Sequence, residues 1–349
     1  MELGKAKAAI PDDGPPSFGP CDLCNTDSFG IRRYWNQTHE RSSERRASDG
    51  APVSAAWVHR PVLAAEVIAH LAPKAGQTIV DATAGLGGHT SLLAERVGEH
   101  GRIIAIDRDR ESVEEARLRV PAANVTWVHG EFSELTLILR RLGATSVDGL
   151  LVDLGVSSPQ LDRAERGFSF MREGPLDMRM DPSSGEPASS LISRLPANQL
   201  ADIFWQFGEE RMSRRIARAI VAERERTPIA TTTQLADVVR RAVPPSRKPD
   251  RIDPATRVFQ ALRIAVNHEL EALDALLAQA PGVIRLGGRV SVISFHSLED
   301  RRVKNAFRGP EWEAITKKPV VATDDENAIN PRARSAKLRS AIRNPAPVA

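Results

Sequence analysis

A glycine-rich stretch in the first third of the chain has the residue types and spacing to bind a ligand. Residues 81–89 read Asp-Ala-Thr-Ala-Gly-Leu-Gly-Gly-His and run from an apolar strand into a helix. Glycine lets the backbone turn sharply and approach a ligand closely, and a helix start offers free N–H groups to an anion. Alone, this pattern is typical either of a nucleotide-binding loop or of a tight strand-to-helix turn.

The next predicted strand ends in Asp107, which narrows the choice of ligand. An acid placed about 20 residues after such a loop can accept hydrogen bonds from ribose hydroxyls. The alternative is that Asp107, like Asp109, caps the helix that follows. The dinucleotide pattern G-x-G-x-x-G, started at Gly85, fails because position 90 is Thr90. S-adenosylmethionine is therefore favoured as the ligand, and an NAD-dependent dehydrogenase is the rival enzyme.

Three further side chains follow predicted strands. Phe132, after the third strand, suits stacking on an adenine ring or packing as an ordinary core residue. Asp153 ends the fourth strand, where an acid can hold an amino group, accept a proton from a substrate, or cap the next loop. His296 follows the last apolar strand and is the second candidate proton acceptor, with a helix-start role as its alternative.

The elements that position these residues alternate regularly along the chain. Apolar strands at 78–80, 102–106, 125–128 and 147–152 are interleaved with amphipathic helices at 62–71, 88–97, 110–120 and 133–142. This alternation predicts an α/β fold with a parallel sheet covered on both faces. Ligands of such sheets bind outside the carboxyl ends of the strands, where the loop, Asp107 and Asp153 would meet.

The alternation stops after the fourth strand, which predicts a domain boundary. Residues 159–254 show no convincing strand and several helical stretches, so we expect a helical insertion that covers the site as a substrate lid. A helix at 255–280, a strand at 289–295 and a helix at 298–307 would then complete the fold. The predicted organisation is a disordered extension (1–50), a core (51–158 and 255–320), the insertion (159–254) and a basic tail (321–349).

Composition and charge limit the remaining choices. The 349 residues carry a net charge of +3, and five basic residues but no acid follow Asn327. Such a tail suits a polyanionic partner, or is simply solvated. No apolar run approaches the ~20 residues needed to span a bilayer, and no secretory signal is present. We therefore expect a cytoplasmic protein without membrane contact. The two cysteines, Cys21 and Cys24, lack a second ligand pair, so we expect no metal.

Several motifs together resemble the bacterial family that methylates the exocyclic N4 of a cytosine in the decoding region of 16S ribosomal RNA. The resemblance covers about residues 59–339, and its motifs lie at 81–89, 105–109, 153–160, 165–170, 174–181, 294–300 and 330–335. It implies a Rossmann-like class I S-adenosylmethionine methyltransferase sheet with an inserted all-helical domain, acting on 16S rRNA within the 30S subunit. It also implies that the cofactor is contacted by Gly87, Gly88, His89, Asp107, Phe132, Asp153 and Gln160.

The absence of certain residue types and motifs bears on which atom of the substrate is methylated. Methylation at cytosine C5 normally uses a cysteine, and both cysteines lie in the N-terminal extension. Ribose 2′-O methylation uses a lysine-rich site, and there is no lysine between Lys74 and Lys248. The Asn/Asp-Pro-Pro-Tyr motif of DNA amino-methyltransferases is also missing. Methylation of a different RNA or DNA base amine, or a non-catalytic RNA-binding role in ribosome assembly, therefore stays open, because the cytosine N4 assignment rests on the resemblance.

Arginine, aromatic and methionine side chains recur in the motifs at 165–170 and 174–181. They suit a loop that grips an extruded base and its phosphates. The alternative is a packed loop beneath the insertion.

Overall fold

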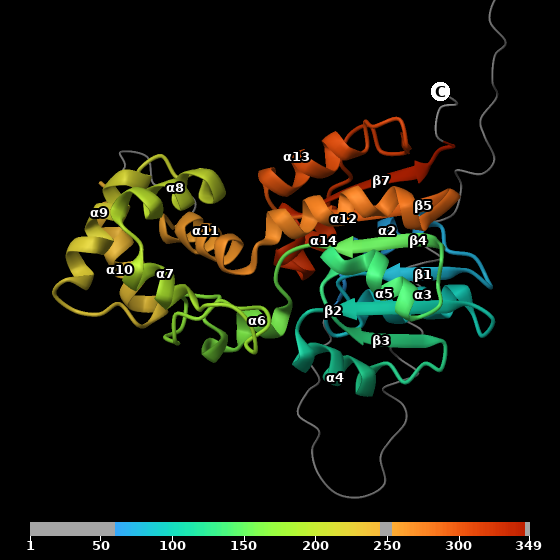
Figure 1. Ribbon diagram of the computed structural model, residues 1–349, viewed down its shortest axis with the longest axis horizontal. Coiled ribbons are helices and arrows are strands. Elements are labelled where there is room, and N and C mark those ends of the chain that lie inside the picture. The colour runs from blue at the N-terminus through green and yellow to red at the C-terminus, as the bar shows by residue number, and fades with distance from the viewer. Residues whose placement is uncertain (1–59, 245–252, 346–349) are drawn as a thin grey trace, which may run out of the picture. The chain divides into compact units, whose positions relative to one another are not determined.

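A seven-stranded sheet is the centre of the structure, a computed structural model that describes residues 60–244 and 253–345. Its strand order is β3-β2-β1-β4-β5-β7-β6 (Figure 1). Neighbouring strands from β3 to β5 are parallel, and β7 is antiparallel to both β5 and β6. The strands are β1 (Thr78–Asp81), β2 (Arg102–Asp107), β3 (Val125–His129), β4 (Val147–Asp153), β5 (Ile284–Ser294), β6 (Trp312–Ala314) and β7 (Lys337–Arg343).

Alternating apolar side chains give the sheet two buried faces. In β2, Ile104 and Ile106 belong to one core cluster, while Ile103 and Ala105 belong to another. The first cluster is shared with α5 (Leu135–Arg141), α12 (Glu269–Val283) and α13 (Ser297–Ala306), and the second with α2 (Ala64–Leu71) and α3 (Gly88–Val97). Helix α4 (Arg110–Arg119) contacts β2 and β3. The predicted α/β fold is therefore confirmed.

A group of helices follows β4 and has a hydrophobic core of its own (Figure 1). These helices are α6 (Ser158–Asp162), α7 (Ala188–Arg194), α8 (Ala197–Gly208), α9 (Ser213–Arg224), α10 (Thr232–Ala242) and α11 (Ala255–Asn267). Thr231 caps α10, because its hydroxyl accepts from Gln234 N and the Gln234 side chain accepts from Thr231 N. Within the described part of 159–254 the only extended pairing is a single bridge between Pro175 and Thr231.

The predicted helix over 255–280 is wrong as a single element. It is divided at His268, which has a left-handed backbone with φ of 50°. Before this break, α11 packs into the helical core through Val258 and Phe259; after it, α12 packs on the sheet through Leu273. The helical lobe, defined here as α7–α11 with the loop at 163–187, therefore ends at Asn267 rather than at 254.

The predicted basic tail over 321–349 is also wrong, because part of it is β7, a strand inside the sheet. Leu338 and Ala341 are buried in the two faces of the sheet. Arg339 is buried as well, and its guanidinium pairs with both carboxylate oxygens of Asp300 at 2.7 and 3.2 Å. Arg343 donates to three carbonyl groups and stacks on a tryptophan ring. These arginines have protein partners, so their charge does not mark a solvated tail.

Short elements complete the chain: the 3-10 turns η1 (Phe132–Glu134), η2 (Ala164–Arg166) and η3 (Pro331–Ser335), and the helix α14 (Asp324–Ile329). No helix in 60–244 or 253–345 is long and apolar enough to cross a bilayer. The predicted extension at 1–50, with Cys21 and Cys24, lies outside the described residues.

Candidate active site

The carboxyl ends of the parallel strands bring the predicted ligand residues to one edge of the sheet. The register pairs Asp81 of β1 with Ala105 of β2 and with Leu151 of β4. Asp107 and Asp153 each lie two residues beyond these partners. The two acids therefore flank the glycine-rich loop that leaves β1.

Hydrogen bonds tie this loop to both neighbouring strands. The N–H of Gly85 donates to Asp107 Oδ2 at 2.7 Å. On the other side, the N–H of Asp153 donates to Thr83 Oγ1 at 2.6 Å. The loop is thus held in one conformation, as a preorganised binding site requires.

Packing favours glycine at positions 87 and 88, and the backbone conformation also favours it at position 87. Gly87 has a φ of 84°, and a Cβ there would lie 2.8 Å from Val120 Cγ2. A Cβ on Gly88 would lie 2.9 Å from Pro61 Cγ. At Gly85, by contrast, a Cβ would meet no atom within 4 Å, so the loop is open at that point. Helix α3 begins directly after the loop, and its first N–H groups have no partner within the helix.

Asp107 keeps acceptor capacity for a ligand. Its Oδ1 accepts from the N–H of Asp109 at 2.8 Å and its Oδ2 from Gly85, so each oxygen retains a lone pair. Burial raises the pKa of Asp107 to about 6, although these backbone bonds lower it. The helix-cap role belongs to Asp109, whose Oδ1 accepts from Glu111 N at 3.2 Å. Ribose binding by Asp107 stays a prediction that this geometry permits.

Asp153 and His89 face each other beside the loop. The distance from Asp153 Oδ2 to His89 Nε2 is 3.6 Å. Asp153 Oδ1 and His89 Nε2 are both buried, and neither has a hydrogen-bond partner among the described residues. Burial lowers the pKa of His89, but the carboxylates of Asp153 and Asp81 outweigh it and leave this pKa raised. Buried polar atoms without partners are costly, so this pair fits a polar ligand group that completes it.

Phe132 and Gln160, both predicted to contact the cofactor, lie in different elements of the structure. Phe132 begins η1, and its partly buried ring packs against the core between the sheet and α12. Gln160 is buried in α6, where its Nε2 donates to Asp109 Oδ2 at 3.0 Å and its Oε1 accepts from Ser157 N at 3.0 Å. The side chain of Gln160 therefore joins α6 to the start of α4. Its contact with a cofactor stays a prediction from the family resemblance.

A buried ion pair that the sequence did not predict joins the helical lobe to the sheet. Arg166 NH1 donates to Asp109 Oδ2 at 2.9 Å, and the two side chains are 8% and 1% exposed. Its NH2 donates to the carbonyls of Arg179 and Met180 at 3.2 and 2.9 Å. Because Asp109 N donates to Asp107, a continuous set of hydrogen bonds runs from the loop at 174–181 to the predicted ribose acceptor.

Asn267 holds the same loop from the other side. Its Oδ1 accepts from Met180 N at 2.7 Å, and its Nδ2 donates to Met178 O at 2.7 Å. Met178 has a φ of 64°, unusual for a side chain of this size, so these bonds also maintain a strained turn. The loop at 174–181 is therefore packed and hydrogen-bonded within the protein. This agrees with the alternative prediction, a packed loop beneath the insertion, rather than with a loop that grips a base.

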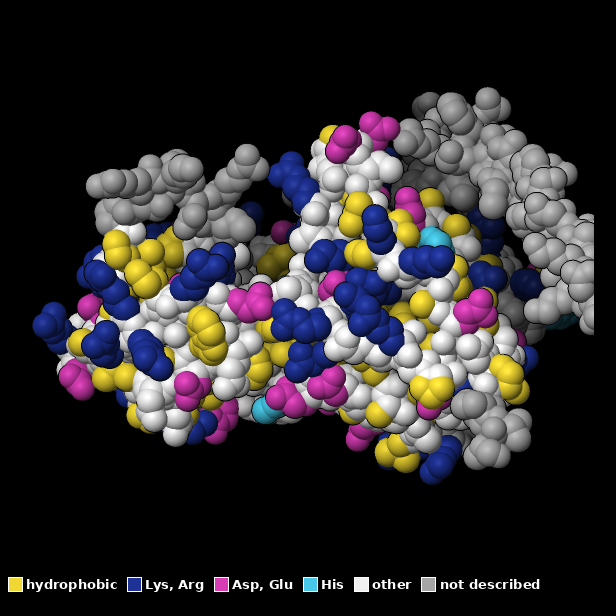
Figure 2. Space-filling view, turned by 90° about the horizontal axis from the view of Figure 1, so that it is seen from above, with side chains coloured by type: hydrophobic (Ala, Val, Ile, Leu, Met, Phe, Trp, Pro, Cys, Tyr) yellow, Lys and Arg dark blue, Asp and Glu magenta, His cyan; other side chains and the backbone are white. Residues whose placement is uncertain are grey.

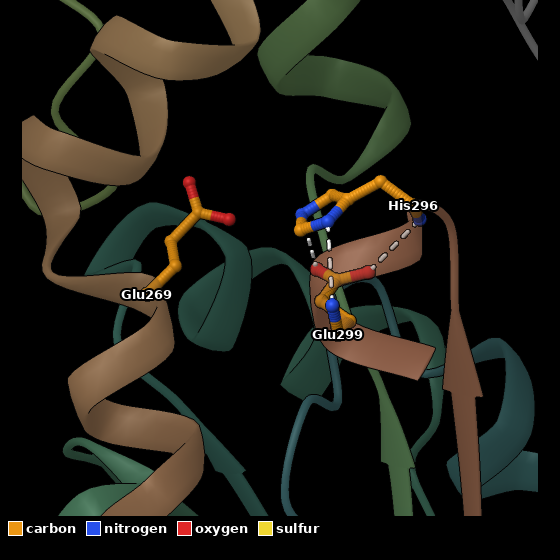
Figure 3. Close-up of side chains that lie close together, drawn as sticks. All are labelled: Glu269, His296 and Glu299. Atoms are coloured by element: carbon orange, nitrogen blue, oxygen red, sulfur yellow. Dashed lines mark hydrogen bonds and ion pairs between the residues drawn. The ribbon is translucent and has the colours of Figure 1, made fainter. Parts of the chain in front are cut away.

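His296 is bound within a buried network of charges (Figure 3). It is the N-cap residue of α13, its Nδ1 accepts from Glu299 N at 3.4 Å, and its Nε2 lies 3.1 Å from Glu299 Oε1. Burial raises the pKa of Glu299, but His296 and Arg263 outweigh it and hold this pKa below its usual value. The capping bond and the pairing with Glu299 both support the predicted helix-start role of His296 over a role in proton transfer.

The same cluster has the spacing of a metal site, because ligand atoms of Glu269, His296 and Glu299 lie within 4.8 Å of one another. However, both carboxylate oxygens of Glu269 accept from Arg263 at 2.8 Å. A metal ion would compete with this guanidinium for the same oxygens. The cluster is therefore best described as an ion-pair network.

Comparison with known proteins gives a consistent family. The profile of the MraW methylase family matches residues 56–344. A protein of Sorangium cellulosum named Ribosomal RNA small subunit methyltransferase H is 56% identical over 288 residues, which cover 82% of this chain and 90% of the relative. Proteins of the same name from Synechococcus sp. and Deinococcus deserti are 50% and 51% identical over 300 and 287 residues; these matches cover 82% of this chain and 92% and 93% of the relatives.

Proposed function

Because the chain belongs to the MraW methylase family, we propose that it methylates the exocyclic N4 of a cytosine in the decoding region of 16S rRNA, within the 30S subunit. The broader activity, S-adenosylmethionine-dependent methylation of small-subunit ribosomal RNA, is that of the family. The observation that carries the proposal is the pair of buried, unpartnered atoms on Asp153 and His89 beside the glycine-rich loop. Choice of the cytosine amine rests on the motifs described above.

The residues at this edge fit the cofactor. S-adenosylmethionine, when bound, supplies a methyl group that is already activated on a sulfonium. Asp107 offers the lone pairs that ribose hydroxyls require, and the backbone of Gly87 and Gly88 lies at the start of α3. Phe132 follows β3 next to the strand that ends in Asp107, so its ring suits the adenine. Asp153 and His89 would face the methionine end.

The protein's part in the reaction is to orient the amine and to remove a proton from it. A cytosine amine is a weak nucleophile because its lone pair is delocalised into the ring. In our proposal, Asp153 Oδ1 accepts a hydrogen bond from the amine N–H, which favours the pyramidal nitrogen needed for attack. His89 lies beside Asp153 Oδ2 and helps to hold this side chain in position. The helical lobe, joined to this edge of the sheet by the pair of Arg166 and Asp109, would help to keep water out.

Asp107→Asn is expected to weaken cofactor binding about 10- to 100-fold, the loss of one or two hydrogen bonds to a charged group. Asparagine would also place an NH2 group against a backbone N–H of Gly85 or Asp109, because both carboxylate oxygens now accept such a bond. Isothermal titration with S-adenosylmethionine measures the change. Asp202→Asn, at an exposed position of α8, is the matched control. Equal affinities for the two variants would refute the role of Asp107.

The affinity for S-adenosylmethionine, measured by the same calorimetric titration, should depend on pH. The pKa of Asp107 is raised to about 6, so the carboxylate is ionised above this pH and protonated below it. A protonated Asp107 has lost part of its acceptor capacity. We therefore expect affinity to fall as the pH drops below about 6, by up to about tenfold per unit. In Asp107→Asn this dependence should disappear; a slope as steep as that of the wild type would assign it to another group.

A further inference from the structure

Two arginines from distant parts of the chain meet at Asp162, the last residue of α6. Arg172, in the loop after η2, donates from NH1 to the Asp162 carbonyl at 3.3 Å. Arg332, in η3, donates from NH2 to Asp162 Oδ1 at 3.3 Å. Arg172 lies in the loop that begins the helical lobe, between the motifs at 165–170 and 174–181, whereas Arg332 belongs to the motif at 330–335.

This meeting point borders the candidate active site. Helix α6 follows β4, and therefore Asp153, after four residues, and its Gln160 is bonded to Asp109. The segment that carries Arg332 leads into β7, whose first residue, Lys337, pairs with Ser294 at the carboxyl end of β5. The arginines thus lie at the rim of the site.

Exposed side chains lie next to Arg172 and close to Arg332 in the sequence. Arg334 is exposed and forms no ion pair with any acid of the described chain. Met171, beside Arg172, is 81% exposed, whereas the preceding Phe170 packs edge-on against Phe259. An apolar side chain held outward next to arginines has no role in the core of the protein. We call Met171, Arg172, Arg332 and Arg334 the rim patch.

Several other arginines of the helical lobe are paired with acids. Arg240 pairs with Asp237 and Asp253, Arg241 with Glu223, and Arg194 with Glu186. Figure 2 shows the same mixture on one face of the molecule, where basic side chains lie beside acidic ones. In the rim patch, Arg332 pairs with the carboxylate of Asp162, which is 56% exposed, and Arg172 bonds the backbone carbonyl of the same residue.

We propose that the rim patch binds the RNA backbone next to the target nucleotide, with phosphate oxygens taking the place of Asp162 as acceptors for Arg172 and Arg332. This inference rests on the proposed function. Guanidinium groups match phosphate oxygens in a bidentate geometry, and a nucleic acid offers one phosphate per nucleotide for several arginines to share. The exposed thioether of Met171 supplies an apolar surface for an unstacked base.

The test replaces the three arginines together by methionine and measures methylation of unmethylated 30S particles. We expect the KM for 30S to rise about 10- to 100-fold while kcat at saturation and the affinity for S-adenosylmethionine stay unchanged, because these contacts are the same in ground and transition states. The dependence of log(kcat/KM) on log salt should become shallower by about 2, since each phosphate contact on a single strand contributes about 0.7.

A matched control carries methionine at Arg117, Arg140 and Arg141. These are exposed residues near the C-terminal ends of α4 and α5, helices that run back to the opposite edge of the sheet. Equal KM and salt slope in the two triple variants would overturn the proposal. Lysine at the three rim positions should retain most of the salt slope, and a loss as large as that with methionine would also overturn it. Failure of the wild type to methylate RNA would instead refute the proposed function.

Discussion

Arg166→Met should destabilise the protein by about 3–5 kcal/mol, the loss expected when one partner of a buried ion pair is removed. Methionine fills a similar volume but leaves Asp109 buried with only Gln160 and backbone groups as donors. It also removes the donors to the carbonyls of Arg179 and Met180. The free energy of unfolding, measured by urea denaturation, reports the change.

Arg194→Met is the control for this variant. Arg194 pairs with Glu186, but both side chains are more than half exposed. An exposed pair of this kind contributes about 0–1 kcal/mol, so the control should be nearly as stable as the wild type. If Arg166→Met lost no more than Arg194→Met, the buried pair would not hold the lobe to the sheet. Adding Asp109→Asn to Arg166→Met should recover part of the loss, because it removes the unpaired charge.

Asp153→Asn should lower turnover about 10²- to 10⁴-fold, the range for loss of a positioned proton acceptor. Asparagine preserves the shape of the side chain but cannot accept a proton, and it weakens the interaction with His89. Single-turnover methylation at saturating cofactor and RNA isolates this step from binding. A decrease of less than about threefold would make Asp153 a binding or structural residue.

His296→Asn tests the second candidate proton acceptor in the same assay. Asparagine is a favourable N-cap residue, so it can replace the capping bond that His296 makes to Glu299 N. If His296 acts only as a helix cap, turnover should stay near that of the wild type. A loss comparable with that of Asp153→Asn would restore His296 as a proton acceptor.

The sheet could be predicted from local patterns because each strand is a short apolar run with a turn signal on either side. Strands β1 to β4 and the helices between them follow such patterns, and the parallel connection then requires that Asp107 and Asp153 meet at one edge. The glycine-rich loop was recognisable for the same local reason. These parts of the candidate site depend on residues close together in sequence.

The remaining parts depend on contacts between distant residues. The sequence predicts a basic tail where β7 lies, because Arg339 resembles a solvated residue until its pairing with Asp300 is known. The break at His268 has no proline or glycine to signal it. The pairing of Asp109 with Arg166 spans 57 residues, and nothing in either local motif identifies the partner. The role of Gln160 as a link to Asp109 was hidden for the same reason.

The central claim is tested most directly by mass spectrometry of 16S rRNA from the source organism with and without the gene. Digested decoding-region fragments are compared between the wild type, the deletion strain and the deletion strain that carries the gene again. We predict that one cytidine loses a methyl group from its N4 in the deletion strain, and that the wild-type gene restores it whereas the Asp153→Asn gene does not. An unchanged set of methylated cytidines in the deletion strain would contradict the proposed function.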